Sequence, residues 1–157
     1  MSKLSHADDK GQSRMVDVSG KQPTLREAVA QGSISMKKET LQLIADGNVP
    51  KGDVLATARI AGIMAAKRTP ELIPLCHPLN IASIAIHFEI DERESRIGIL
   101  SRVKVTGRTG VEMEALTAVA AAALTVYDMC KAVDREMVIS GILLVEKSGG
   151  RSGHFKR

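Results

Sequence analysis

Two runs of alternating apolar and polar residues most constrain how this chain can fold. Ala82–Ile90 carries an apolar side chain at nearly every second position, and Arg96–Thr106 alternates in the same way. Successive side chains of a strand point to opposite faces of a sheet, so both runs predict strands with one buried face. The charged segment Asp91–Ser95 between them predicts a turn, and the two strands should form a hairpin.

Helical and strand patterns lie on both sides of this hairpin. Before it, Ser33–Lys37 predicts a short strand, a short helix through Leu41 and Ile44 should end at Asp46-Gly47, and Asp53–Arg68 has helical spacing. Prolines at positions 70, 74 and 78 predict a stiff, extended connection to the hairpin.

After the hairpin, Thr109-x-x-Glu112 matches a capping box and opens an Ala-rich helix that should reach about Val133. Met137–Val145 is almost continuously apolar and predicts a strand buried on both faces. The order is βαββαβ, which predicts an α+β ferredoxin-like sandwich, an antiparallel sheet with helices on one face.

The composition fits a single domain. A chain of 157 residues with 44% hydrophobic content can bury a core, and with no Trp, one Tyr and two Phe that core must consist of Ala, Val, Ile and Leu. We expect a disordered segment at residues 1–14, one ferredoxin-like domain at 15–147, and a Gly-rich basic tail at 148–157.

The net charge of +4 favours anionic partners. Nucleic acid fits poorly, because few aromatic side chains are available to stack on bases and no basic run is longer than two residues. A small phosphorylated metabolite fits better. Cys76 and Cys130 have no CxxC spacing, which indicates reduced thiols and a cytoplasmic protein. No signal peptide is recognised, and Ala115–Val126 is too short to span a bilayer.

Polar residues gather in three dense blocks, Lys51–Val54, Leu72–Leu79, and Thr109–Glu114 running on to Tyr127–Lys131. They supply lysines, carboxylates and a histidine, the groups that move protons and hold anionic substrates.

Each candidate also has a structural explanation. Asp128 and Lys131 share a helix face, either as a surface ion pair or as a proton-transfer pair. Glu112 would complete the capping box, and Glu114 would interact favourably with the helix dipole.

The same choice holds for the remaining candidates. His77 precedes a proline and suits ligand binding or a structural hydrogen bond equally. Its neighbour Cys76 does not give a zinc-ligand spacing, so no metal site is predicted. Lys51 lies at a helix start that could hold phosphate, whereas the dipole alone explains Lys67 at a helix end.

Spacing along one helix predicts an oligomer. Glu114 and Asp128 are fourteen positions apart, which is roughly 21 Å of helical rise. Lys51 and Lys67 would be about 24 Å apart by the same measure. One small ligand cannot touch both ends, so if all these residues serve one site, the site must lie between subunits.

Several blocks together resemble the MoaC family of cyclic pyranopterin monophosphate synthases, over about Met15 to Gly153. The blocks are Met15–Ser19, Lys51–Val54, Ala56–Ile63, Leu72–Leu79, Thr109–Thr117, Tyr127–Ala132 and Lys147–Gly153. The resemblance implies a lyase of molybdenum cofactor biosynthesis that converts 3′,8-cyclo-7,8-dihydro-GTP into cyclic pyranopterin monophosphate and releases pyrophosphate. It also implies a homohexamer, a trimer of dimers, with active sites at subunit interfaces and no redox cofactor.

The resemblance implies a role for each matching residue. Asp128 would be the general acid/base, with Lys131 and Lys51 as its catalytic partners. Substrate would be bound by Leu75, Cys76, His77, Met113 and Glu114, with Glu112, Lys67, Asp17 and Arg26 as further contributors. Mg²⁺ would enter only with the substrate triphosphate, because no carboxylate cluster specifies a metal site.

Two other functions fit the residues without the resemblance. A ferredoxin-like regulatory module would bind a phosphorylated nucleotide or metabolite unchanged, since this fold hosts many functions. A structural oligomer with incidental charges would bind no ligand at all.

Overall fold

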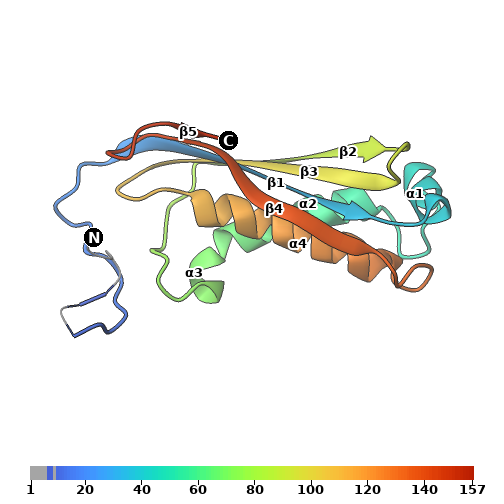
Figure 1. Ribbon diagram of the computed structural model, residues 1–157, viewed down its shortest axis with the longest axis horizontal. Helices are drawn as coiled ribbons and strands as arrows, with labels where there is room; N and C mark the ends of the chain where they lie inside the picture. Colours follow the sequence, from blue (N-terminus) through green and yellow to red (C-terminus); the bar gives the residue numbers. More distant parts are fainter. Residues whose placement is uncertain (1–6, 9) are drawn as a thin grey trace.

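The computed structural model describes residues 7–8 and 10–157, which form a two-layer α+β fold (Figure 1). One layer is an antiparallel five-stranded sheet in the order β2-β3-β1-β4-β5. Its strands are β1 (Thr24–Ser35), β2 (Ser83–Asp91), β3 (Arg96–Gly107), β4 (Val138–Ser148) and β5 (Phe155–Lys156). The first four strands have the ferredoxin-like βαββαβ arrangement, so the fold class is confirmed.

The second layer consists of helices on one face of the sheet (Figure 1). α2 (Val54–Lys67) and α4 (Glu112–Cys130) pack against each other, and α4 also contacts β1, β3 and β4. α1 (Lys38–Ala45) follows the end of β1, and α3 (Thr69–Leu72) is a short helix after α2. Among the residues that the structure describes, none forms a helix on the opposite face of the sheet.

Small residues let α4 lie close to its neighbours. Ala115, Ala118, Val119 and Ala122 are fully buried along it. Where α2 crosses, Gly62 leaves no room for a side chain, because a Cβ there would lie 2.8 Å from the Ala118 carbonyl oxygen. α4 is also long and apolar enough to cross a membrane, but half of its apolar window is buried inside the fold. Its packing is that of a core helix.

The hairpin and the two helices predicted before it, α1 and α2, are confirmed. β2 and β3 pair across the predicted turn, Asp53 and Arg68 are the caps of α2, and α1 stops before Gly47, whose φ of 69° suits glycine.

Predictions made upstream of the hairpin need two corrections. The first strand begins at Thr24 rather than Ser33. Because it is central in the sheet, Ala28, Val29 and Ala30 are all buried and show no alternation. The connection after α2 is not extended throughout, since Pro70 lies in the first turn of α3, where its missing N–H costs nothing.

Downstream, the capping box is wrong. Val111 is the N-cap of α4, without a side-chain hydrogen bond, and Glu112 is the first helical residue. The helix ends at Cys130, not Val133. The predicted strand exists as β4, but it is not buried on both faces, because Val138 and Ile142 are exposed on the isolated chain.

Both ends of the chain have local structure. Ala7 pairs with Ser13 in an isolated bridge, and the disorder predicted for residues 1–6 and 9 lies outside the described residues. The Gly-rich tail folds back on β4, with Lys147 opposite Phe155 and the Arg157 N–H donating to the Val145 carbonyl oxygen at 2.9 Å.

Candidate functional site

The three predicted catalytic residues meet at the C-terminal end of α4, and we call them the Asp128 cluster. Lys131 Nζ lies 2.7 Å from Asp128 Oδ1. Lys51 Nζ reaches the same residue from the loop before α2, 3.2 Å from Oδ2 and 2.9 Å from the main-chain oxygen. The structure thus brings together Lys51, Asp128 and Lys131 from segments 77 positions apart.

The loop that carries Lys51 is well fixed. The Gly52 N–H donates to the Val49 carbonyl oxygen at 2.9 Å, and Gly52 has a φ of 102°. Asp53 then caps α2 by accepting the Ala56 N–H at 2.9 Å. These bonds aim the Lys51 side chain at α4.

The two lysines set the protonation state of the cluster. Hydrogen bonds from Lys131 and then Lys51 lower the pKa of Asp128, and the Asp128 carboxylate raises the pKa of Lys131. The side chains of all three are about half exposed, so water and mobile ions screen their attraction. The arrangement is an ionised carboxylate flanked by two cationic donors that a ligand can reach.

The predicted substrate-binding residues gather at the other end of α4, around a cavity of about 290 Å³ that we call the His77 pocket. Its lining residues are Val16, Val18, Lys21, Leu75, Cys76, His77, Leu79, Thr109, Gly110, Glu112, Met113 and Glu114. Of the predicted binding residues, Leu75, Cys76, His77, Glu112, Met113 and Glu114 are among them, whereas Lys67, Asp17 and Arg26 are not.

Hydrogen bonds fix the floor and rim of the His77 pocket. His77 Nε2 donates to the Val16 carbonyl oxygen at 2.7 Å, so this ring nitrogen carries a proton and joins two segments of the wall. Glu112 Oε1 pairs with Lys147 Nζ at 3.3 Å. Lys147 also donates to Ser152 Oγ at 2.5 Å, which links the pocket to the C-terminal hairpin.

Glu114 is the least exposed carboxylate of this pocket, with 3% of its surface accessible. Burial, and to a lesser extent the Glu112 charge, raises the pKa of Glu114. Burial and then the Glu114 charge raise the pKa of the Cys76 thiol. Glu114 is therefore suited to hold a proton, and Cys76 is not activated as a nucleophile.

Sequence reasoning missed part of the basic rim. Lys21 lines the His77 pocket, and its carbonyl oxygen accepts from Arg108 Nε at 2.9 Å. Arg26, which the resemblance implied as a further contributor, does not line this pocket; its Nε donates to the Gly107 carbonyl oxygen at 3.0 Å and braces the loop that leads into α4. No spacing in the sequence pairs Arg26 with Gly107, because their contact depends on the pairing of β1 with β3, which sets Arg26 opposite Val105.

Two predicted residues contribute less to the geometry. Lys67 is exposed at the last position of α2 and lines neither the His77 pocket nor the Asp128 cluster. Asp17 accepts hydrogen bonds from Ser19 within its own turn.

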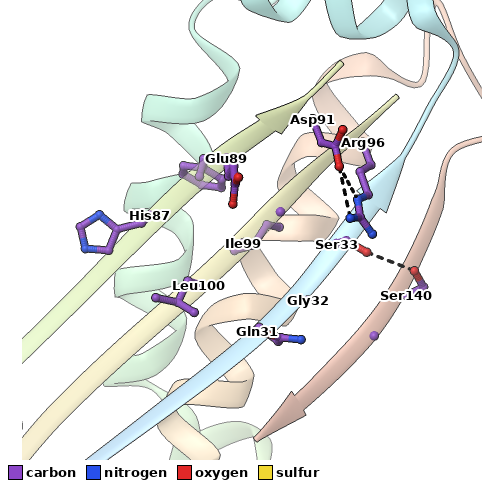
Figure 2. A pocket seen from close by; sticks show the side chains of 13 residues that line it. Gln31, Gly32, Ser33, His87, Glu89, Asp91, Arg96, Ile99, Leu100 and Ser140 are labelled. Carbon is purple, nitrogen blue, oxygen red and sulfur yellow. Dashed lines mark hydrogen bonds and ion pairs between the residues drawn. The ribbon is translucent and has the colours of Figure 1, made fainter. Parts of the chain in front are cut away.

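A larger cavity of about 590 Å³ lies on the helix-free face of the sheet (Figure 2). Four of its polar side chains pair with one another, Arg96 with Asp91 at 3.2 Å and Ser33 Oγ with Ser140 Oγ at 3.2 Å. It contains none of the predicted site residues. We therefore do not take this cavity as the candidate site, although it is larger than the His77 pocket.

Metal ligands do not cluster in the described part of the chain. Over residues 7–8 and 10–157, no group of three or more His, Cys, Asp or Glu side chains could hold an ion. Cys76 and Cys130 are both free thiols.

Fold and site together define a ferredoxin-like α+β protein with a carboxylate held between two lysines and a separate polar pocket. A sequence profile of the MoaC family matches residues 15–150. The chain belongs to the MoaC family.

Three relatives that match this chain over nearly its full length are all named cyclic pyranopterin monophosphate synthase. The cyclic pyranopterin monophosphate synthase of Pelotomaculum thermopropionicum is 64% identical over 157 residues, all of this chain and 92% of the relative. That of Heliobacterium modesticaldum is 62% identical over all of this chain and 99% of its own. That of Clostridium acetobutylicum is 57% identical over 98% of this chain and 96% of its own.

Proposed function

We propose that this protein is a cyclic pyranopterin monophosphate synthase of molybdenum cofactor biosynthesis. It would be a lyase that converts 3′,8-cyclo-7,8-dihydro-GTP into cyclic pyranopterin monophosphate and pyrophosphate. The observation that carries this proposal is Asp128 held between Lys51 and Lys131 in a member of the MoaC family.

The geometry suggests a separate role for the Asp128 cluster and for the His77 pocket. Asp128 is ionised and can accept a proton, while Lys51 and Lys131 are donors that can neutralise charge on a departing pyrophosphate. The His77 pocket would hold the rest of the substrate through Leu75, Cys76, His77 and Met113, with the buried Glu114 carboxyl, whose pKa is raised, and with Glu112 oriented by Lys147.

We also propose that the active site is completed by a second subunit, in a homohexamer built as a trimer of dimers. The Asp128 cluster and the His77 pocket lie at opposite ends of α4, too far apart for one ligand in one chain. Exposed apolar side chains on the outer helical surface, Ile60, Met64 and Leu124, favour self-association. Lys67 would then reach the site of a neighbouring subunit.

The cellular compartment and the metal requirement are also part of what we propose. The two free thiols suit the reducing cytoplasm. The reaction should need no resident cofactor, and Mg²⁺ would arrive with the substrate triphosphate. Enzyme treated with a chelator and then freed of it should be fully active on substrate supplied with Mg²⁺, and a requirement for a further metal would contradict this.

The test is pyrophosphate release from 3′,8-cyclo-7,8-dihydro-GTP by the wild type and by Asp128→Asn. We expect the variant to lose about 10²–10⁴-fold in rate, the usual contribution of acid/base catalysis, while still binding substrate. Asp91→Asn is the matched control, since Asp91 is also ion-paired but lies by the helix-free face of the sheet.

A regulatory module gives a different result. It would bind the compound without releasing pyrophosphate, and its affinity would barely change in Asp128→Asn. Equal release by the wild type and Asp128→Asn would keep the enzyme but remove Asp128 from the chemistry.

A further inference from the structure

Asp134 is a buried carboxylate that belongs to neither the Asp128 cluster nor the His77 pocket. It lies in the turn between α4 and β4, with 2% of its surface exposed. Its Oδ2 accepts the main-chain N–H of Lys37 at 2.9 Å and the Thr40 hydroxyl at 3.1 Å. Its Oδ1 accepts the N–H of Glu136 at 3.0 Å. Three donors thus converge on one side chain that sequence analysis did not single out.

The charge on Asp134 follows from those donors. Burial raises the pKa of its carboxyl, but the hydrogen bonds from Lys37, Glu136 and Thr40 outweigh burial and lower it below its ordinary value. Asp134 is therefore ionised at neutral pH, inside the fold, with its negative charge satisfied by hydrogen bonds.

The contacts of Asp134 anchor the start of α1. Lys37 is the N-cap of α1 and makes no side-chain capping bond of its own. Asp134 instead accepts the main-chain N–H of Lys37 itself, from 97 positions away. Lys37 Nζ also pairs with Glu136 Oε2 at 2.7 Å, so the start of α1 is bound twice to the α4–β4 turn.

On the α4 side, Asp134 follows the Asp128 cluster within one tight turn. The Lys131 N–H donates to the Tyr127 carbonyl oxygen at 2.8 Å, and the Asp134 N–H donates to the Cys130 carbonyl oxygen at 3.0 Å. This turn leaves little freedom between Lys131 and the anchored Asp134 carboxylate.

On the α1 side, a short, fixed path leads to Lys51. α1 has eight residues and ends in a turn in which the Gly47 N–H donates to the Ile44 carbonyl oxygen at 3.1 Å. Val49 is then buried, 6% exposed, two residues before Lys51. The position of α1 consequently sets the position of the loop that carries Lys51.

We propose that Asp134 is a positioning residue, which joins the start of α1 to the α4–β4 turn and so keeps Lys51 within hydrogen-bond distance of Asp128. It touches neither member of that pair. The consequence for catalysis depends on the proposed function, but the geometric effect on Asp128 can be measured without turnover.

The direction in which the pKa of Asp128 changes when Asp134 is replaced distinguishes a positioning role from a direct electrostatic effect. Lys131 and Lys51 are the charged groups that face Asp128, and both lower its pKa. Removing the Asp134 charge by itself would lower the pKa of Asp128 further, because one negative neighbour is lost. Losing contact with Lys51 would raise the pKa of Asp128. Only the positioning role predicts a rise.

The experiment is a carbon-13 NMR titration of the Asp128 carboxyl in the wild type, Asp134→Asn, Lys51→Ala and the double variant. We expect the midpoint to rise in Asp134→Asn and in Lys51→Ala, and the double variant to match Lys51→Ala alone. An unchanged or lower midpoint in Asp134→Asn, or the same extra rise when Lys51 is already absent, would overturn the proposal.

Two further variants serve as a control for the loss of a buried hydrogen bond and as a substitute for a variant that does not fold. Ser101→Ala removes a buried hydrogen bond near the other end of α4, 2.7 Å to the Ala115 carbonyl oxygen, and should leave the Asp128 midpoint unchanged. If Asp134→Asn does not fold, Thr40→Val takes its place, because it removes one donor and keeps the charge. A smaller rise in Thr40→Val supports the proposal, and no rise overturns it. Absence of pyrophosphate release would count against the proposed function alone.

Discussion

Glu114 and Asp128 are carried by the same helix, fourteen positions apart, one in the first turn of α4 and the other in its last. The helical rise puts roughly 21 Å between them along the axis. Glu114 belongs to the His77 pocket and Asp128 to the cluster with Lys51 and Lys131. A rigid core helix keeps these two sets of groups apart in every single chain.

Mixing inactive variants should therefore restore activity. In an interface shared by two subunits, Glu114→Ala and Asp128→Ala each spoil every site of a homo-oligomer. A mixed pair has one site with both defects and one with neither. Random co-assembly should recover roughly a quarter of wild-type pyrophosphate release, as expected for a two-fold pair. No recovery in mixed oligomers verified by mass spectrometry would place the whole site in one chain.

The raised pKa of Glu114 makes a prediction about stability and pH. Its folded-state pKa lies above the ordinary value of 4.5, so the folded protein holds this proton more tightly than the unfolded chain does. The free energy of unfolding should fall as pH rises from 4.5 through the folded-state pKa.

Glu114→Gln should remove that loss. We expect the variant to be more stable than the wild type at pH 7, because it does not have to ionise a carboxyl that is buried in the folded state. The difference should shrink below pH 4.5. Urea unfolding at the two pH values measures it. Glu112→Gln serves as the control, because Glu112 is less buried and paired with Lys147; an equal gain there would contradict the assignment.

Local patterns predicted much of this fold. The hairpin and α2 follow from alternation and helical spacing, which depend on neighbouring residues. β1 was largely missed because Ala28–Ala30 are all buried in a central strand, and a strand's position in the sheet is a property of the tertiary fold. The capping box failed because Glu112 turns to Lys147, a partner brought in by β4.

The candidate site shows the same limit. The helix spacing of Asp128 and Lys131 is visible in the sequence, and their contact is confirmed. The approach of Lys51 was inferred from the family resemblance, and the Asp134 contacts were not foreseen at all. Each depends on how loops fold against α4, which no periodicity encodes. Their functional roles remain predictions.

Close packing between α2 and α4 should be sensitive to one methyl group. In Gly62→Ala the new Cβ would lie 2.4 Å from Ile86 Cδ1 and 2.8 Å from the Ala118 carbonyl oxygen, and the latter belongs to a helix backbone. The clash should cost about 1–3 kcal/mol, more than the gain in helix propensity. Gly98→Ala is the control, since its Cβ meets nothing closer than 3.8 Å. Thermal unfolding should show a lower midpoint only for Gly62→Ala.

The C-terminal hairpin should depend on Gly149 through contact and not through backbone conformation alone. Gly149 and Gly153 both have positive φ, 96° and 66°, so alanine is strained at either position. Only at Gly149 would the Cβ also collide, 2.2 Å from the Leu25 carbonyl oxygen of β1, whereas space around Gly153 is open.

Limited trypsin digestion can compare the two variants, because Arg151 is exposed in the hairpin turn. If the collision adds about 1.4 kcal/mol, cleavage after Arg151 should be about tenfold faster in Gly149→Ala than in Gly153→Ala. Opening the hairpin also removes Ser152 from Lys147, and so loosens the partner of Glu112 at the His77 pocket. Substrate affinity should then fall in Gly149→Ala and hold in Gly153→Ala. Equal cleavage of the two variants would show that the glycine turn does not anchor the hairpin to β1.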